Sequence, residues 1–346
     1  MVKAIQIGLG HWGFSWSKDV IPNVPTVEMV GYVDTNPEAT ERVQTELGID
    51  PKLCFHSLED AAHHTDATLA LCTLRTEAHY PVVKRCLELG YNVLVEKPFT
   101  TTIAQGKELV ALAKAQGKVL MVSQNYRHQP APIAAADLIA EGKFGALNMV
   151  SIDFRRHGPS QGYRYWDMPD PLLADMSIHH FDLMRFVLGD EPVRLSCRTW
   201  NPPGSPFRFD PSGVATIEFS KGTVVSYRAS WMNSGPVTPW AGEWVMDGAE
   251  GQIAWSSRDH FRDKAGPDVL TLLPLDGKPE KVKLTPVKFA DRMGTLNAMA
   301  KVLDTGEVPR GFSSGADNLG SLALVQGTIL SASRGGDWVD IREVMG

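Results

Sequence analysis

The chain has 346 residues and a formal net charge of −6, with 43% hydrophobic and 21% charged residues. This length suggests two domains, and the composition is ordinary for a globular protein with a sizeable core. Neither a basic run nor an apolar run of about 18 residues occurs, which disfavours nucleic acid and membrane partners. From the pattern of the first residues we expect no signal peptide, and the four cysteines form no C-x-x-C pair. We therefore expect a cytoplasmic protein with reduced thiols.

A strand pattern over residues 2–7 runs into the segment Gly8-Leu9-Gly10-His11-Trp12-Gly13, which fits G-x-G-x-x-G. Glycines at this spacing allow a tight turn and let the backbone approach a pyrophosphate at the start of a helix. A second strand pattern ends at Asp34, about 20 residues later, where a carboxylate accepts hydrogen bonds from ribose hydroxyls. This carboxylate repels a 2′-phosphate, and Thr35 and Asn36 add no cation, so the sequence favours NAD over NADP.

Strand and helix patterns alternate up to residue 123, which predicts a parallel sheet wound on both faces. The apolar strand at residues 93–95 runs directly into Glu96-Lys97-Pro98. Lys97 thus follows the carboxyl end of a buried strand, where open α/β sheets bind ligands, and Pro98 restricts its backbone. On local sequence alone, a solvated turn that ends the strand is an equal alternative.

A second group of polar residues has helical spacing in the other half of the chain. Asp175, His179 and Asp182 share one helix face, whereas His180 lies off that face and is expected to be packed. An imidazole between carboxylates can be oriented and can exchange protons near neutral pH, so His179 is a candidate partner for Lys97. A solvated face with ion pairs and a zinc site are the alternatives, although no further ligand cluster accompanies these residues.

Short alternating segments between residues 193 and 284 are separated by hairpin turns and predict an antiparallel sheet. We therefore expect an α/β protein with an N-terminal Rossmann domain at residues 1–124. A C-terminal α+β domain with a large, mainly antiparallel sheet would occupy residues 125–346. Aromatic faces suit sugar C–H surfaces and arginine donates to hydroxyls, so Tyr163, Trp166 and Arg156 are candidate substrate contacts.

The order of these motifs resembles the Gfo/Idh/MocA family of oxidoreductases. The shared features are GLGHWG, Asp34, VLVEKPF, a strand running into Gln124-Asn125-Tyr126-Arg127, and a pattern close to D-x-G-x-H-x-x-D at residues 175–182. The resemblance implies catalytic positions for Lys97, Asp175 and His179. It also implies substrate contacts from these three and Arg127, and cofactor contacts from Gly8, Gly10, His11, Trp12, Gly13, Asp34, Thr73, His79, Glu96 and Lys97. The chain differs at Thr73-Leu74-Arg75, where members often have Thr-Pro-Asn, and it lacks the glycines that usually precede residue 175.

We therefore expect an NAD-dependent dehydrogenase that oxidises a secondary hydroxyl of a sugar, cyclitol or related polyol. In this hypothesis His179 removes the hydroxyl proton, Lys97 stabilises the charge on oxygen, and Asp175 orients His179 or binds a neighbouring hydroxyl. Members of the family differ on whether the lysine or the histidine is the formal base, so both assignments stay open. The alternatives are a regulator that senses NAD or a sugar, an NADPH-dependent sugar-ketone reductase, and a metal-dependent lyase or hydrolase. No metal is expected, and the resemblance implies a homodimer or homotetramer formed through the C-terminal sheet.

Overall fold

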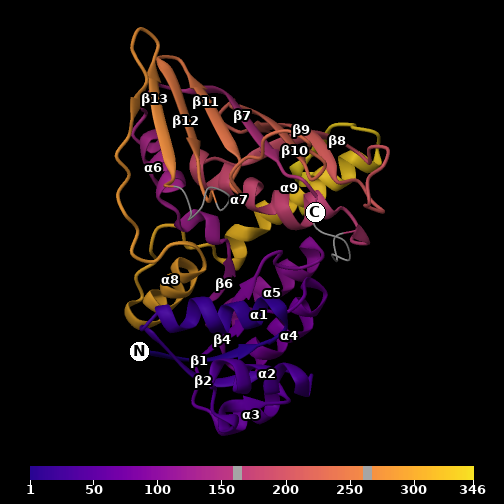
Figure 1. Cartoon of the computed structure of the whole chain (residues 1–346), viewed down its shortest axis with the longest axis vertical. Helices are drawn as coiled ribbons and strands as arrows, with labels where there is room; N and C mark the ends of the chain where they lie inside the picture. Colours follow the sequence, from indigo (N-terminus) through magenta and orange to yellow (C-terminus); the bar gives the residue numbers. More distant parts are fainter. Residues whose placement is uncertain (159–165, 260–266) are drawn as a thin grey trace. The chain divides into compact units, whose positions relative to one another are not determined.

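The structure, a computed structural model, describes residues 1–158, 166–259 and 267–346 (Figure 1). Two compact units make up the chain: Met1–Asn125 with Phe289–Leu319, and Tyr126–Lys288 with Gly320–Gly346. Within the described residues, no helix combines the length and the apolar character that crossing a membrane requires.

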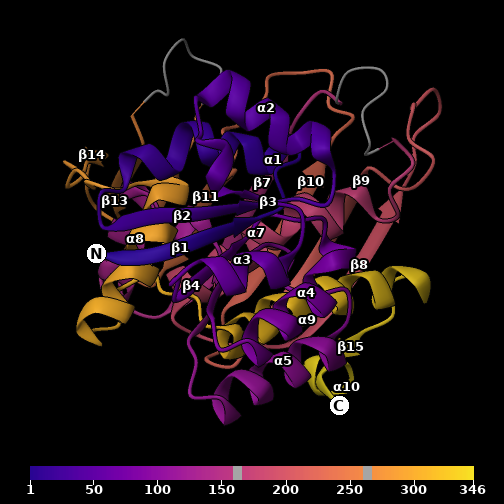
Figure 2. The same ribbon diagram turned by 90° about the horizontal axis from the view of Figure 1, so that it is seen from below.

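A parallel sheet of six strands forms the centre of the first unit, in the order β3-β2-β1-β4-β5-β6. The strands are β1 (Val2–Ile7), β2 (Val27–Val33), β3 (Cys54–Phe55), β4 (Leu69–Cys72), β5 (Asn92–Glu96) and β6 (Leu120–Ser123). The helices are α1 (His11–Ser15), α2 (Pro37–Leu47), α3 (Leu58–His64), α4 (Thr76–Glu88) and α5 (Ile103–Ala115). Figure 2 shows α1 and α2 on one face of the strands and α3 and α4 on the other. This is the Rossmann strand order, so the predicted doubly wound sheet is confirmed.

Local sequence explains where helix α2 begins and ends. The side chain of Asn36 accepts a hydrogen bond from the backbone N–H of Glu38, and Pro37 occupies the first helical position. Gly48 ends the helix with φ of 69°, a left-handed conformation that costs glycine little. These signals fix the start of α2 directly after the loop that carries Asp34.

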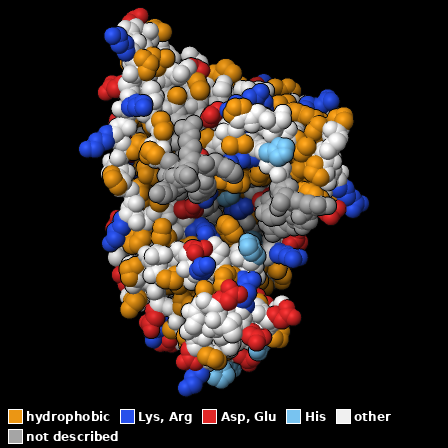
Figure 3. All heavy atoms as spheres, viewed as in Figure 1, with side chains coloured by type: hydrophobic (Ala, Val, Ile, Leu, Met, Phe, Trp, Pro, Cys, Tyr) orange, Lys and Arg blue, Asp and Glu red, His pale blue; other side chains and the backbone are white. Residues whose placement is uncertain are grey.

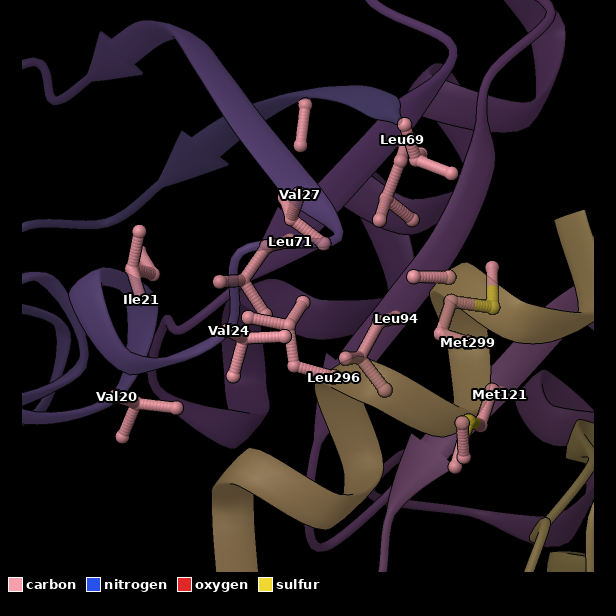
Figure 4. Packing of buried hydrophobic residues seen from close by; sticks show 14 of the residues in the cluster. Val20, Ile21, Val24, Val27, Leu69, Leu71, Leu94, Met121, Leu296 and Met299 are labelled. Carbon is pink, nitrogen blue, oxygen red and sulfur yellow. The ribbon is translucent and has the colours of Figure 1, made fainter. Parts of the chain in front are cut away.

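One further helix of the first unit comes from late in the sequence. Helix α8 (Asp291–Thr305) buries Leu296 and Met299 in one apolar cluster with Leu71 and Leu94 of the sheet (Figure 4). The predicted second domain, residues 125–346, included this helix, and the structure assigns Phe289–Leu319 to the first unit instead. An apolar helix face shows that a helix is buried but not which sheet it covers.

The second unit contains a sheet of nine strands in the order β14-β13-β12-β11-β7-β10-β9-β8-β15. Among the described strands of this sheet, only β7 and β10 pair in parallel, so the predicted, mainly antiparallel sheet is confirmed. The strands are β7 (Leu147–Arg155), β8 (Pro192–Trp200), β9 (Ser212–Phe219), β10 (Val224–Ser230), β11 (Glu243–Gly248), β12 (Gly251–Ser256), β13 (Val269–Pro274), β14 (Glu280–Lys281) and β15 (Val339–Asp340). The helices are α6 (Pro130–Ala140), α7 (Ser177–Leu188), α9 (Gly315–Ser333, which begins in the first unit) and α10 (Ile341–Met345).

Burial alternates along the central strands of this sheet. Val150, Ile152 and Phe154 of β7 are buried, whereas Asp153 and Arg155 between and beside them are more accessible. On the accessible face Arg155 donates to Asp153 and Glu243, so charges pair across neighbouring strands. Basic and acidic side chains are also interspersed on the side of the molecule shown in Figure 3. Assembly into a homodimer or homotetramer through this sheet stays a prediction. Light scattering on the purified protein measures the mass of the assembly and so tests its size.

Candidate active site

The glycine-rich loop lies at the carboxyl edge of the first sheet. Gly8 has φ of 92°, and a Cβ on Gly13 would lie 1.9 Å from the Gly8 carbonyl oxygen, so the fold itself requires both glycines. A Cβ on Gly10 would meet no atom within 4 Å, although this residue immediately precedes helix α1. The protein does not need a glycine there, but a ligand that approaches the backbone does. The loop therefore fits a dinucleotide pyrophosphate.

Strand register brings the other predicted residues of this half to the same edge. Ile7 at the end of β1 pairs with Val33 of β2 and with Cys72 of β4, and Cys72 pairs with Val95 of β5. Gly8, Asp34, Thr73 and Lys97 follow these strand ends, so the sheet assembles them as the sequence predicted. Ligands of open α/β sheets bind at this edge.

Asp34 is fixed beside the glycine-rich loop by backbone donors. Its carboxylate accepts hydrogen bonds from Leu9 N at 2.7 Å and from Asn36 N at 2.9 Å. Each carboxylate oxygen can accept a further bond, so the group remains suited to ribose hydroxyls.

A cation that the sequence analysis missed also lies beside this loop. The guanidinium of Arg42, on helix α2, is 3.9 Å from the ring centre of Phe14, and its Nη2 is 3.5 Å from the Gly10 oxygen. The sequence analysis sought cations only directly after Asp34, but the helix brings this side chain back to the loop. Arg42 therefore bears on the choice between NAD and NADP.

Thr73 has a structural role that the resemblance did not predict. Its side chain is only 4% exposed and donates to the Gly8 oxygen at 2.6 Å. Gln6, buried in β1, donates to Thr73 Oγ1 and to the Gly13 oxygen, at 3.1 and 2.7 Å. The Thr73 hydroxyl thus fixes the shape of the loop, and the predicted cofactor contact of Thr73 stays a prediction. Gln6 could have been identified as a structural residue from its position as a polar side chain within an apolar strand.

Glu96 and His79 position Lys97 instead of presenting polar atoms at the surface. Glu96 is buried and accepts hydrogen bonds from Trp16 Nε1 at 2.8 Å and from Lys97 N at 3.1 Å. His79 is 1% exposed, with Nδ1 2.8 Å from the Pro98 oxygen and Nε2 3.2 Å from the Leu74 oxygen. Burial lowers the pKa of His79.

The predicted cofactor contacts of Glu96 and His79 stay predictions beside this structural role. Both side chains hold the segment around the Lys97–Pro98 peptide, which is cis. They thereby set the direction in which Lys97 leaves the end of β5.

His11 and Trp12 are exposed at the start of helix α1. The Trp12 ring is 46% exposed, and the Arg292 guanidinium from α8 lies 4.4 Å from its centre. Arg292 also donates to Ser15 Oγ at 3.1 Å. This arginine, nearly 280 positions from the loop in sequence, was not predicted.

Asp175 and His179 are both buried in the second unit, each 7% exposed. The predicted continuous helix is instead a π-helical segment, Pro171–Met176, followed by helix α7. Asp175 lies in the π-helical part, a feature frequent at functional sites. The His179 ring stacks on Tyr126, with centres 4.1 Å apart and planes 7° from parallel. Tyr126 was not predicted as a site residue.

Arg127 and Asp182 form a buried ion pair. Arg127 Nε and Nη2 donate to the two Asp182 oxygens, each at 2.6 Å, and Ser321 donates to Asp182 at 2.8 Å. The Arg127 guanidinium thus binds the helix acid in a bidentate arrangement, and the predicted substrate contact of Arg127 stays a prediction.

The remaining predicted substrate residues have different outcomes. Arg156 is 2% exposed, with its guanidinium 4.1 Å from the ring centre of Trp240, and burial lowers its pKa to about 10. Trp166 is half-buried, and its Nε1 has no hydrogen-bond partner among the residues that the structure describes. Tyr163 lies outside those residues. The described ranges contain no group of three or more His, Cys, Asp or Glu side chains able to hold a metal ion.

His180 is packed, as the sequence predicted. Its Nδ1 lies 2.8 Å from the Tyr227 hydroxyl and its Nε2 lies 3.0 Å from the Trp240 oxygen. Complete burial lowers the pKa of His180 to about 4. The imidazole is therefore neutral in the folded protein near pH 7.

We expect this buried imidazole to make the protein sensitive to mild acid. Because the folded pKa is about 4 and the ordinary value 6.5, the unfolded chain binds the extra proton between these pH values. The contribution, about 3 kcal/mol, is complete above pH 6.5 and is lost as the pH falls toward 4. Chemical unfolding at several pH values measures it. Between pH 4 and 6.5, the slope of unfolding free energy against pH should be smaller in His180→Gln, by about the amount that one bound proton contributes. His63→Gln, at an exposed site, should leave this slope unchanged. An unchanged slope in His180→Gln would contradict the assignment.

Comparison with known proteins identifies the family. Residues 3–124 match the model of the oxidoreductase family with an NAD-binding Rossmann fold, and residues 133–254 match the GFO/IDH/MocA C-terminal domain. An uncharacterized protein of Sinorhizobium fredii is 26% identical over 96% of this chain and 94% of its own length. The scyllo-inositol 2-dehydrogenase (NAD(+)) of Bacillus subtilis is 28% identical over 66% of this chain and 67% of its own length.

Solved structures share the fold. The inositol dehydrogenase homolog from Azotobacter vinelandii, complexed with NADH and myo-inositol, has a TM-score of 0.81 and 18% identity. The match covers 98% of this chain and 97% of that one. The two family models match consecutive parts of the chain and together span more than half of the sequence. The chain therefore belongs to the Gfo/Idh/MocA family of oxidoreductases.

Proposed function

We propose that the protein is an NAD-dependent dehydrogenase that oxidises a secondary hydroxyl of a sugar, cyclitol or related polyol. The observation that carries the proposal is Lys97, held by Glu96 and His79 at the sheet edge that also bears the glycine-rich loop and Asp34. An ammonium so positioned can act on substrate beside a bound dinucleotide. The names of the Bacillus subtilis and Azotobacter vinelandii relatives support a polyol as the substrate class.

Gly8, Gly10, Gly13 and Asp34 would hold the dinucleotide, which supplies the hydride acceptor when bound. In the proposed reaction Lys97 donates a hydrogen bond to the substrate oxygen and stabilises its developing negative charge. His179 removes the hydroxyl proton, and Asp175 orients the imidazole. Lys97 belongs to the first unit, whereas Asp175 and His179 belong to the second. Kinetic measurements on variants of each residue test whether the three act on the same substrate.

A coenzyme assay tests the proposal. Absorbance at 340 nm is followed with NAD or NADP against a panel of cyclitols, aldoses, sugar acids and anhydrosugars. Because Asp34 repels a 2′-phosphate, we expect NAD to exceed NADP in kcat/KM by at least about tenfold. Arg42→Gln should lower any remaining NADP activity more than NAD activity, and Lys52→Gln, at an exposed site of the same unit, should change neither.

Three results would contradict this reading. A preference for NADP would favour the reductase alternative and give Arg42 the dominant role. Coenzyme binding by calorimetry without turnover of any substrate would favour the sensor alternative. Loss of activity on chelation would favour a metal-dependent enzyme.

A further inference from the structure

The amide side chain of Gln124 is buried at the end of β6. Gln124 directly follows the strand and is only 1% exposed. Within the described ranges of the chain, neither its Oε1 nor its Nε2 has a hydrogen-bond partner. Almost all buried polar groups of folded proteins are paired, because an unpaired group costs the free energy of removing it from water. The amide of Gln124 therefore indicates a partner that these parts of the chain do not supply.

The residues on either side of Gln124 are paired within the first unit. Ser123 Oγ lies 3.3 Å from Thr295 Oγ1 of helix α8. The Asn125 side chain donates to Asp291, at the start of the same helix. The backbone N–H of Gln124 donates to the carbonyl two residues earlier, at 2.9 Å. The backbone is thus fixed on both sides of Gln124, so a loose loop does not explain the unpaired amide.

Strand register places Gln124 beside Lys97. Glu96, the last residue of β5, pairs in parallel with Ser123, the last residue of β6. Lys97 and Gln124 follow directly, so they leave neighbouring strands at the same level of the sheet edge. Because neighbouring strands lie about 4.8 Å apart, side chains of both residues can contact one small ring system.

The strand order determines which part of a dinucleotide meets Gln124. Asp34 follows β2 and suits the ribose of the adenosine half, and the glycine-rich loop follows β1. On the side of β1 away from β2, β5 and β6 are the second and third strands, about 10 and 14 Å from β1. An extended dinucleotide with its pyrophosphate at β1 therefore brings its nicotinamide half to the ends of β5 and β6.

The Gln124 side chain matches the carboxamide that nicotinamide carries. Each group combines a carbonyl acceptor and an NH₂ donor in one plane, so the two can exchange a pair of reciprocal hydrogen bonds. The carboxamide is attached to the ring carbon next to C4, the carbon that accepts the hydride. A residue that holds the carboxamide therefore determines which face of the ring is turned toward the substrate.

We propose that Gln124 binds the carboxamide of the nicotinamide ring and thereby fixes the ring beside Lys97. This inference rests on the proposed function, because it assigns one further contact of the same coenzyme. Gln124 is then a residue that determines coenzyme specificity. Dinucleotides whose ring carries no amide should bind less tightly, because the buried Gln124 amide stays unpaired in their complexes.

Calorimetry without substrate tests the inference. The titrants are NAD, ADP-ribose, which lacks nicotinamide, and the 3-acetylpyridine analogue of NAD, in which a methyl group replaces the amide nitrogen. Because two hydrogen bonds are lost, Gln124→Met should bind NAD about 10- to 100-fold more weakly than the native protein does. Its affinity for ADP-ribose should stay within about twofold of the native value. The native protein should prefer NAD to the analogue by about tenfold, and Gln124→Met should show no preference.

Gln116→Met is the matched control, because it makes the same change at an exposed site directly after helix α5 of the same unit. It should leave all three affinities unchanged. Thermal melting without coenzyme gives a second test, because removal of an unpaired buried amide should leave the Tm equal or raise it. If Gln124→Met does not fold, Gln124→Asn replaces it. Asparagine keeps the amide on a shorter side chain, and the same selective loss of NAD affinity is expected.

Unchanged NAD affinity in Gln124→Met, or equal losses for NAD and ADP-ribose, would overturn the inference while leaving the dehydrogenase proposal intact. A lower Tm with native NAD affinity would make the Gln124 amide a structural group and would also overturn it. Failure of the native protein to bind either coenzyme would overturn the proposed function together with this inference. A selective loss of NAD affinity supports the inference even if no substrate is turned over, because binding is measured without substrate.

Discussion

Lys97→Met is expected to lower kcat by about 10³-fold while leaving the affinity for NAD within a few-fold of the native value. Methionine approximates the length of the lysine side chain but donates no hydrogen bond. Glu96 and His79 contact the backbone at residues 97 and 98, so the turn should keep its shape in the variant. The loss corresponds to about 4 kcal/mol of transition-state stabilisation. Steady-state kinetics and calorimetry with NAD measure the two quantities separately.

Lys114→Met is the matched control, because it removes an exposed ammonium from the last turn of helix α5, at the other end of that helix from Lys97. Its turnover should equal that of the native protein. Native turnover in Lys97→Met would end the catalytic assignment. An equal loss of NAD affinity and of turnover would instead make Lys97 a cofactor-binding residue with no separate catalytic role.

Sequence patterns could predict the residues whose roles depend on local backbone geometry. The spacing of Gly8, Gly10 and Gly13, the position of Asp34 and the strand before Lys97 all follow from neighbours in sequence. Parallel strands then collect these residues at one edge. Fold class could be predicted for the same reason, since alternating patterns determine which elements form and how they pair.

Hydrogen-bond partners could not be predicted in this way. Thr73, Glu96 and His79 are polar residues at motif positions, but their partners are buried groups that only the folded chain brings near. Arg42 was missed because helix α2 returns it to the glycine-rich loop. In both units the sequence could propose candidate site residues but could not identify the side chains that support them.

Arg127 and Asp182 show the same limit most clearly, and their pairing predicts a large effect on stability. Asp182→Ala should lower the free energy of unfolding by about 3–5 kcal/mol, because it leaves the Arg127 guanidinium buried without its bidentate partner. Replacing both residues, as Arg127→Met with Asp182→Leu, should recover much of that loss. Chemical denaturation monitored by tryptophan fluorescence measures all three proteins.

The ion pair between Arg194 and Glu218 provides the comparison, because it has the same bidentate form at 2.8 and 2.9 Å but lies on the surface. Glu218→Ala should therefore change stability far less than Asp182→Ala, since water solvates the arginine that remains. Similar small losses in both variants would mean that the Arg127 charge finds other compensation, and would support the predicted substrate-binding role of Arg127. A large loss of stability confined to Asp182→Ala would establish that the pair of Arg127 and Asp182 stabilises the position of helix α7, which carries His179.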